Sequence, residues 1–107
     1  YEMRTCLVGS EMCIRDRLLR AKGGLLLQTN IGYNHAHVDA DMPHTTTLYY
    51  VNDSDGDTYF FDNDGNIIEK VTPKKGRIVT FDGLTYHSSS CPRENSHRLV
   101  LNFNYVI

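Results

Sequence analysis

The stretch "TYFFDNDGNIIEKVT", residues 58–72, decides the fold class of this chain. Its two halves, 58–62 and 66–72, are rich in the aromatic and β-branched residues that favour strands. Between them, the Asn-Asp-Gly sequence at 63–65 is a strong signal for a tight hairpin turn. The stretch therefore predicts two antiparallel strands joined by a short turn.

Outward from this hairpin, short strand-like segments alternate with turn signals, and no helical periodicity is present from Leu25 onward. The pattern predicts strands at 25–33, 45–51, 58–62, 66–72, 77–81, 85–90 and 98–107. Strands of this length and spacing are typical of an antiparallel sandwich or barrel, so we expect an all-β fold.

Composition limits the classes of function. A chain of 107 residues is one small domain, and 40% hydrophobic residues with a net charge of −2 are ordinary for a soluble globular protein. No apolar run approaches the roughly 18 residues that a membrane span needs. Lysine and arginine are scattered along the chain, so the sequence does not indicate nucleic-acid binding.

The N-terminal segment differs from the rest of the chain. The sequence "CLVGSEMCIRDR", Cys6 to Arg17, resembles one reading frame of a transposase adapter used to prepare sequencing libraries. We therefore interpret 1–17 as a non-native segment and 18–107 as the native domain. Only Cys91 then remains, and a single cysteine fits a reducing compartment such as the cytoplasm.

The stretch "YNHAHVDADMPH", residues 33–44, contains the densest group of metal-ligating side chains. In an extended strand, His35, His37 and Asp39 would share one face because residues two apart point the same way. His87 lies far along the chain, where a later strand could return it to the same site.

Two histidines and one carboxylate form the facial triad that binds non-haem Fe(II) with open coordination positions. Arg98, eleven residues after His87, would supply a fork of donors for a carboxylate. A metal with vacant positions and a nearby carboxylate clamp are what the binding of a 2-oxo acid co-substrate requires.

These residues stand within a longer ordered pattern: "HVD", "LYYVN", "DGDTYF", "PKKGRIVTFDGLTYH" and "RLVLNFNY". The pattern resembles the C-terminal part of a 2-oxoglutarate- and Fe(II)-dependent dioxygenase of the prolyl-4-hydroxylase-like superfamily, in a form common in phage and marine metagenomes. The resemblance implies a double-stranded β-helix, a cupin-like jelly roll, here N-terminally truncated. For a phage protein, the cytoplasm would be that of the infected host cell.

The same resemblance implies the roles of individual residues. The iron ligands would be His37, Asp39 and His87, and Arg98 would bind the 5-carboxylate of 2-oxoglutarate. Further co-substrate contacts would come from Tyr50, Asn102, Thr58 and Phe60. The implied reaction hydroxylates a prime substrate, for example a prolyl or another protein side chain, and uses Fe(II), 2-oxoglutarate, O2 and ascorbate as reductant. It releases succinate and CO2.

Two other functional classes are compatible with single features of the chain. A cupin-type metal- or ligand-binding module without dioxygenase activity would use His35, His37, Asp41 and His87. Cupins, however, place the last histidine soon after a P-x-G turn, whereas Gly76 precedes His87 by eleven residues. A metal-free jelly roll would leave all these side chains without a ligand role. His44 and His97 are expected to be solvent-exposed loop residues.

Overall fold

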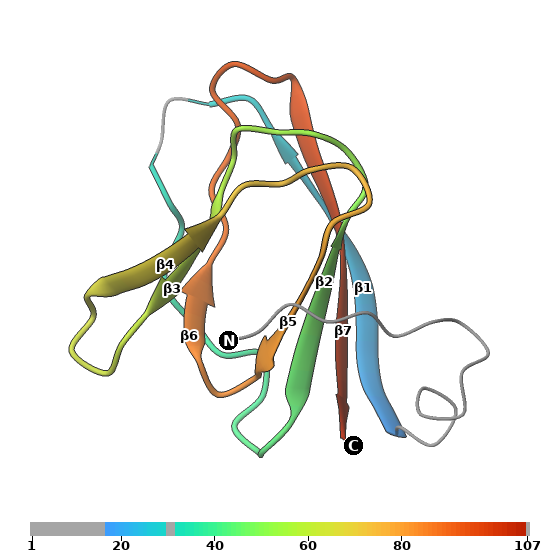
Figure 1. The fold of residues 1–107 in the computed structure, drawn as a ribbon, viewed down its shortest axis with the longest axis vertical. Coiled ribbons are helices and arrows are strands. Elements are labelled where there is room, and N and C mark those ends of the chain that lie inside the picture. The colour runs from blue at the N-terminus through green and yellow to red at the C-terminus, as the bar shows by residue number, and fades with distance from the viewer. Residues whose placement is uncertain (1–16, 30–31, 107) are drawn as a thin grey trace.

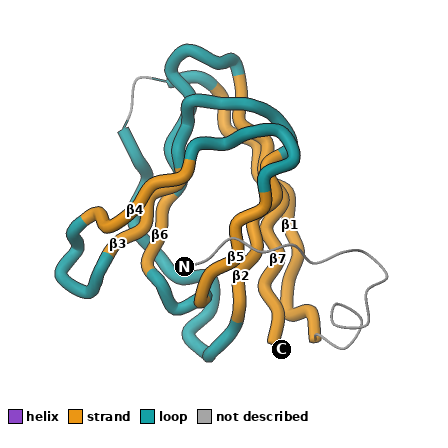
Figure 2. Tube along the Cα trace, in the orientation of Figure 1, coloured by secondary structure: helices purple, strands orange, loops and turns teal. Residues whose placement is uncertain are grey.

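The computed structural model describes residues 17–29 and 32–106, and within these ranges the chain forms strands and loops but no helix (Figures 1 and 2). No helix in this part of the chain is therefore available to cross a membrane. The strands are β1 (Arg17–Leu27), β2 (Thr45–Tyr50), β3 (Thr58–Phe61), β4 (Ile67–Val71), β5 (Ile78–Asp82), β6 (Tyr86–Ser88) and β7 (His97–Val106). The prediction of an all-β fold is confirmed.

The strands form two sheets that face each other across the interior (Figure 1). The larger sheet has the order β1-β7-β2-β5 and the smaller one the order β4-β3-β6. Every pairing within them is antiparallel, as the sequence predicts. β6 and β7 lie in different sheets, so the last connection of the chain crosses from one sheet to the other.

The core lies between the two sheets. Alternate residues of β2 point inward, which buries Leu48 and Tyr50 and leaves their neighbours partly exposed. Phe60 of the smaller sheet meets Phe81 of the larger one edge to face, with 4.8 Å between ring centroids. Aromatic contacts of this geometry stabilise a core by about 0.5–1.5 kcal/mol beyond their buried area. The buried apolar cluster comprises Leu48, Tyr50, Phe60, Val71, Val79, Phe81 and Val100.

The hairpin that decided the fold class is present. The Asp62 carboxylate accepts hydrogen bonds from the backbone amides of Asp64 and Asn66, both at 2.9 Å. Gly65 has a φ of 84°, a left-handed conformation that glycine adopts without steric cost. Turn chemistry therefore sets the β3–β4 connection, as predicted.

β1 differs from its prediction. The sequence predicts a strand at 25–33, whereas β1 begins at Arg17 and ends at Leu27. Gly23 and Gly24 weaken the local strand signal, but pairing with β7 along its whole length imposes the extended conformation. The interpretation of 1–17 as non-native lies outside the described residues, apart from the backbone of Arg17.

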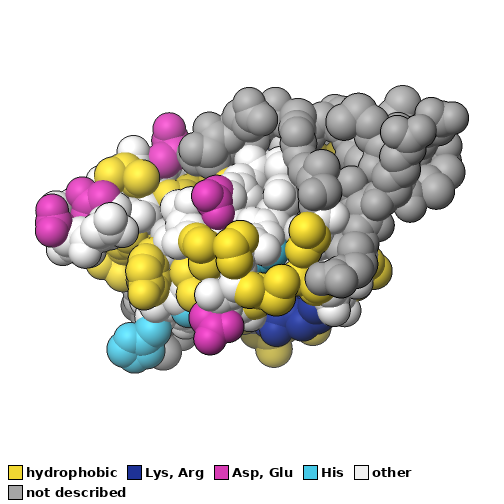
Figure 3. Space-filling view, turned by 90° about the horizontal axis from the view of Figure 1, so that it is seen from below, with side chains coloured by type: hydrophobic (Ala, Val, Ile, Leu, Met, Phe, Trp, Pro, Cys, Tyr) yellow, Lys and Arg dark blue, Asp and Glu magenta, His cyan; other side chains and the backbone are white. Residues whose placement is uncertain are grey.

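β7 has a polar inner face and an apolar outer face. Arg98, Val100 and Asn104 are buried on the inner face, as the alternation of the sequence predicts. Leu101 on the outer face is 37% exposed. Further apolar side chains reach the surface around the β5–β6 turn, where Leu84 is 42% exposed, and a view from below shows apolar side chains among acidic ones (Figure 3).

Candidate metal centre

The backbone brings the first histidine to the last one. His37 lies in the extended segment between β1 and β2, and its amide donates to the His87 carbonyl at 2.9 Å. The His87 amide donates back to the His37 carbonyl at 3.0 Å. The strand expected around His37 is thus reduced to an isolated bridge against β6. This bridge places the two imidazole rings side by side, with centroids 4.7 Å apart.

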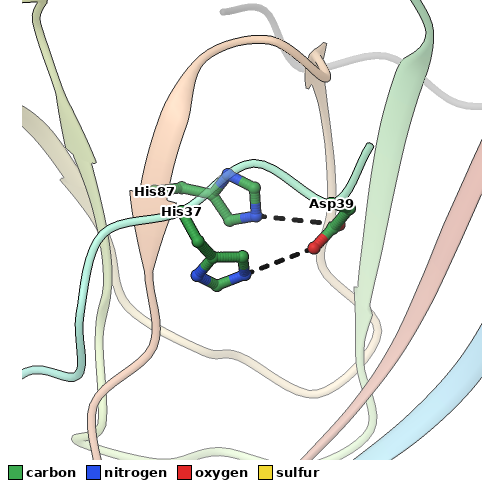
Figure 4. Close-up of side chains that lie close together, drawn as sticks. All are labelled: His37, Asp39 and His87. Atoms are coloured by element: carbon green, nitrogen blue, oxygen red, sulfur yellow. Dashed lines mark ion pairs between the residues drawn. The ribbon is translucent and has the colours of Figure 1, made fainter. Parts of the chain in front are cut away.

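Asp39 completes a cluster with both histidines (Figure 4). His37 Nε2 lies 3.2 Å from Asp39 Oδ1, and His87 Nε2 lies 3.8 Å from Asp39 Oδ2. All three ligand atoms lie within 4.8 Å of one another. Three potential metal ligands, separated by up to 50 positions in the chain, therefore converge on one point.

Both histidines present the same nitrogen to this point. Nδ1 of His37 lies 3.2 Å from the His35 carbonyl, and Nδ1 of His87 lies 2.9 Å from the Thr85 carbonyl. A carbonyl can only accept, so each Nδ1 carries the proton and donates it. In the neutral rings, Nε2 then has a free lone pair directed at Asp39. This arrangement orients histidine ligands in metal sites.

The His87 ring is buried, with 4% of the residue exposed, and its Nε2 has no hydrogen-bond partner within the part of the chain that the structure describes. At 3.8 Å, the Asp39 carboxylate is too distant for a hydrogen bond. A buried polar atom without a partner is costly and therefore uncommon. Its lone pair is directed at the same point as the other two ligands.

The Asp39 side chain is only 2% exposed, and donors surround its carboxylate. Asn102 and Asn104 each donate to Oδ2 at 3.1 Å, and Arg20 Nη2 lies 3.3 Å from Oδ1. Burial alone would raise the pKa of Asp39, but hydrogen bonds from His37 and the two asparagines, with His87 nearby, lower it well below its ordinary value. Asp39 is therefore an anion across the physiological pH range.

His37 is affected in the opposite direction. Its hydrogen bond to the Asp39 carboxylate raises the pKa of His37 above 6.5, despite partial burial and the charge of Lys22. The pair thus favours a protonated His37 when nothing else occupies the site.

Arg98 forms a second polar cluster behind the first. Its Nε donates to the Gly56 carbonyl and its Nη2 to Thr58 Oγ1, both at 2.7 Å. Tyr50 lies beside it, with its hydroxyl 2.8 Å from Thr58 Oγ1 and its ring 5.8 Å from the guanidinium carbon. Burial lowers the pKa of Arg98. Among the described residues, no carboxylate lies within 4 Å of this guanidinium.

One pocket of about 200 Å³ connects the two clusters. Its volume is smaller than the roughly 300–1,000 Å³ of pockets for drug-sized ligands. A small molecule of roughly ten heavy atoms or fewer therefore suits it. The pocket is lined by Lys22, Gly24, Leu26, His37, Leu48, Thr58, His87, Ser89, Arg98, Val100 and Asn102.

The structure separates the remaining sequence-predicted residues. Thr58 and Asn102 line the pocket, while Tyr50 and Phe60 are fully buried in the core behind it. Phe60 was expected in the pocket wall; instead, it packs beneath His87, with 6.4 Å between ring centroids. His35 contributes its carbonyl but is not a member of the metal-ligating cluster.

One expectation about a loop histidine is wrong. His44 is 7% exposed, and its Nδ1 donates to the Met42 carbonyl at 2.7 Å. Its ring packs against Gly83, where a Cβ atom would overlap the imidazole. The absence of a side chain at Gly83, 39 positions along the chain, leaves space for this ring, and a local sequence pattern cannot reveal that relationship. His97 is exposed, as expected.

Sequence reasoning also missed two residues around Asp39. Asn104 is 2% exposed and donates to both Asp39 and Thr46. Its place on the inner face of the last strand was a usable signal. Arg20 had none, because Gly23 and Gly24 shortly after it weaken the strand signal.

Comparison with known families bears directly on this site. Residues 25–106 match the model of the 2OG-Fe(II) oxygenase superfamily. This matched range includes every residue of both clusters except Arg20. The chain belongs to this superfamily. The chain also aligns with a crystal structure, that of protein NMB1881 from Neisseria meningitidis, over 84% of this chain and 81% of that one. That alignment has 15% sequence identity and a TM-score of 0.43. No curated protein sequence matches this chain.

Proposed function

We propose that this oxygenase is an Fe(II)- and 2-oxoglutarate-dependent dioxygenase in which His37, Asp39 and His87 bind the metal. The observation that carries the proposal is the buried, unpartnered Nε2 of His87, directed at the same point as His37 Nε2 and the Asp39 carboxylate. Superfamily membership supports the same assignment.

The donor set fits a divalent iron site. Ligand atoms about 2.1 Å from an octahedral ion are about 3 Å apart along one edge of the octahedron. The separations of 3.2 and 3.8 Å between the histidine nitrogens and the carboxylate are close to this value. Two imidazoles and one carboxylate are also the ligand types of the facial triad, which leaves positions open for other ligands.

Arg98 is proposed to bind the distal carboxylate of 2-oxoglutarate. Arg98 as a whole residue is 5% exposed, so its side chain has lost most of its hydration, and a carboxylate in the pocket would offset that loss. Thr58 accepts from the same guanidinium and is close to the Tyr50 hydroxyl, so both residues hold Arg98 in place. Asn102 uses one N–H of its side-chain amide to hold Asp39. Its proposed contact with the co-substrate therefore falls to the second N–H, because 2-oxoglutarate offers only hydrogen-bond acceptors.

The chemistry divides between metal and protein. Bound Fe(II) would supply the redox chemistry by which O2 oxidises 2-oxoglutarate to succinate and CO2 while one C–H bond of a prime substrate is hydroxylated. The protein binds and orients the co-substrate through Arg98. It keeps both Nε2 lone pairs available through the Nδ1 hydrogen bonds, and it holds Asp39 as an oriented anion.

Finer assignments follow from the resemblance rather than from the site. We propose that the two facing sheets belong to a double-stranded β-helix and that the chain is of the prolyl-4-hydroxylase-like type. A prolyl or other protein side chain is then the proposed prime substrate, with ascorbate as reductant. The native domain is proposed to begin at residue 18.

Fe(II)-dependent succinate formation from 2-oxoglutarate by the purified chain tests the function. His37→Ala, Asp39→Ala and His87→Ala should each abolish both succinate release and Fe(II) binding. Arg98→Ala should retain Fe(II) and raise the KM for 2-oxoglutarate. His35→Ala is the matched control for loss of an imidazole and should retain Fe(II).

Two results would contradict the proposal. Loss of the metal in His35→Ala with retention in Asp39→Ala would favour the cupin-type ligand set. Metal binding without any 2-oxoglutarate turnover, in wild type and in Arg98→Ala alike, would leave a metal-binding module rather than an oxygenase.

A further inference from the structure

Arg20 is the one charged residue that contacts the metal-ligating carboxylate from the larger sheet within the described ranges. It lies on β1, directly opposite Asn104 of β7, and both side chains are on the inner face. Its Nη2 is 3.3 Å from Asp39 Oδ1, and its Nε donates to Asn104 Oδ1 at 3.1 Å. Asn104 in turn donates to Asp39 Oδ2. The three side chains therefore form a closed ring of contacts.

Within this ring, the asparagines orient the Asp39 carboxylate, whereas the arginine adds a charge. Asn102 and Asn104 both donate to Oδ2, and two bonds to one oxygen are enough to fix the orientation of a carboxylate. The addition that Arg20 makes is a charge: a guanidinium is a permanent cation, whereas an amide is neutral. The Asp39 carboxylate is 2% exposed but the Arg20 side chain is 44% exposed, so solvent screens part of the interaction between the two charges.

We propose that Arg20 is a positioning residue that cancels the negative charge of Asp39 and so keeps the metal-loaded pocket attractive to a dianionic co-substrate. This inference rests on the proposed function. With Arg20 present, Asp39 no longer offsets the charge of a divalent ion, and the pocket keeps that charge together with those of Arg98 and Lys22. The chain as a whole carries a net charge of −2, so the positive charge of the pocket comes from the local arrangement of these side chains and not from the overall charge.

A charge role for Arg20 predicts opposite effects on two affinities, that for the anionic co-substrate and that for the metal ion. Removing a positive charge from about 6 Å away, at an effective dielectric constant of about 40–80, weakens binding of a unit anion about three- to tenfold. The same removal cannot weaken binding of a divalent cation by Coulomb forces and should strengthen it. A purely structural role for Arg20 would instead weaken both.

The test uses the full chain with Co(II) in place of Fe(II), because Co(II) is stable in air and its d–d absorption reports ligand binding. Co(II) titration gives the metal Kd, and calorimetry on the Co(II)-loaded protein gives the 2-oxoglutarate Kd. Arg20→Gln should raise the 2-oxoglutarate Kd about three- to tenfold and leave the Co(II) Kd equal or lower. Arg20→Lys, which keeps the charge, should keep both values within about twofold.

Arg93→Gln is the matched control, because Arg93 is exposed in the β6–β7 loop and the change removes the same charge. It should leave both Kd values unchanged. Wild-type 2-oxoglutarate affinity in Arg20→Gln would overturn the inference, as would a parallel loss of Co(II) and 2-oxoglutarate affinity. If Arg20→Gln does not fold, Arg20→Lys decides: retained affinity supports the charge role, and lost affinity overturns it.

The experiment also separates this inference from the proposed function. If the wild-type chain fails to bind Co(II), the proposed function fails and takes the role of Arg20 with it. If the wild type binds Co(II) and 2-oxoglutarate but Arg20→Gln binds both equally well, only the role of Arg20 fails.

Discussion

Replacing His87, a proposed metal ligand, should leave the metal-free protein about as stable as the wild type. Its buried Nε2 has no hydrogen-bond partner among residues 17–29 and 32–106, and such a group costs about 1–3 kcal/mol of stability. His87→Leu removes that cost. It also removes the hydrogen bond from Nδ1 to the Thr85 carbonyl, which contributes about 0.5–1.5 kcal/mol, and an edge contact with Phe81 of similar size.

These contributions nearly cancel, so the free energy of unfolding of metal-free His87→Leu should lie within about 1 kcal/mol of the wild-type value. Added metal should then separate the two proteins. At a free Co(II) concentration one hundred times its Kd, the wild type gains about 2.7 kcal/mol. For a domain of this size, that gain corresponds to a rise in Tm of about 10–20 °C. His87→Leu should show no rise.

Thermal unfolding with and without Co(II), followed by circular dichroism, measures both quantities. His44→Leu is the matched control, since His44 is also buried with an unpartnered Nε2 and a bonded Nδ1 but lies outside the metal-ligating cluster. It should keep the full rise in Tm. A loss of more than about 3 kcal/mol in metal-free His87→Leu would show that the ring is needed for packing, against the accounting above. A retained Co(II) response would remove His87 from the ligand set.

Three further outcomes follow from the structure. Hydrogen bonding to Asp39 raises the pKa of His37, so the pair's contribution to metal-free stability should be complete below pH 6.5 and lost as the pH rises through the raised pKa. Urea unfolding from pH 5 to 9 should show this loss of stability, and Asp39→Asn should abolish the pH dependence. Gly56→Ala should destabilise the protein by about 2–4 kcal/mol in urea unfolding, since its Cβ would overlap the Ser90 carbonyl oxygen, and stability within about 0.5 kcal/mol of wild type would refute the clash. Leu101→Thr should reduce binding of a hydrophobic dye, because this side chain is exposed on the outer face of β7, and unchanged dye binding would place the apolar surface elsewhere.

Local sequence signals were sufficient wherever turn chemistry or strict alternation determines the structure. The hairpin at Gly65 and the inner face of β7 are examples, since left-handed glycine and period-two alternation act over a few residues. The contact between His37 and His87, in contrast, does not depend on local sequence signals. No local rule brings residues fifty positions apart into one bridge, and it was the resemblance to an oxygenase family that anticipated it.

The sequence misled where tertiary pairing overrides local preference. β1 contains two adjacent glycines, and no strand was predicted before Leu25, yet pairing with β7 holds the segment extended from Arg17 to Leu27 with one irregularity between Leu18 and Arg20. This error hid Arg20, because its side chain direction depends on the register with Asn104. His44 was misjudged for a related reason: its burial depends on the absence of a side chain at Gly83, which no pattern around His44 reports.

The register of β7 links the fold to the proposed chemistry. Arg98 and Asn102 are four residues apart on one face, about 13 Å along the strand, so this strand sets the distance between the proposed carboxylate clamp and the asparagine that holds Asp39. Val100 lies between them and lines the same pocket. A slip of one residue against β2 would turn Arg98 and Asn102 outward and bring Leu99 and Leu101 into the pocket. Both polar clusters would be lost together, and the buried apolar faces of β2 and β5 would not compensate. The strand that holds the core in register would therefore also hold the proposed co-substrate site in register with the candidate metal site.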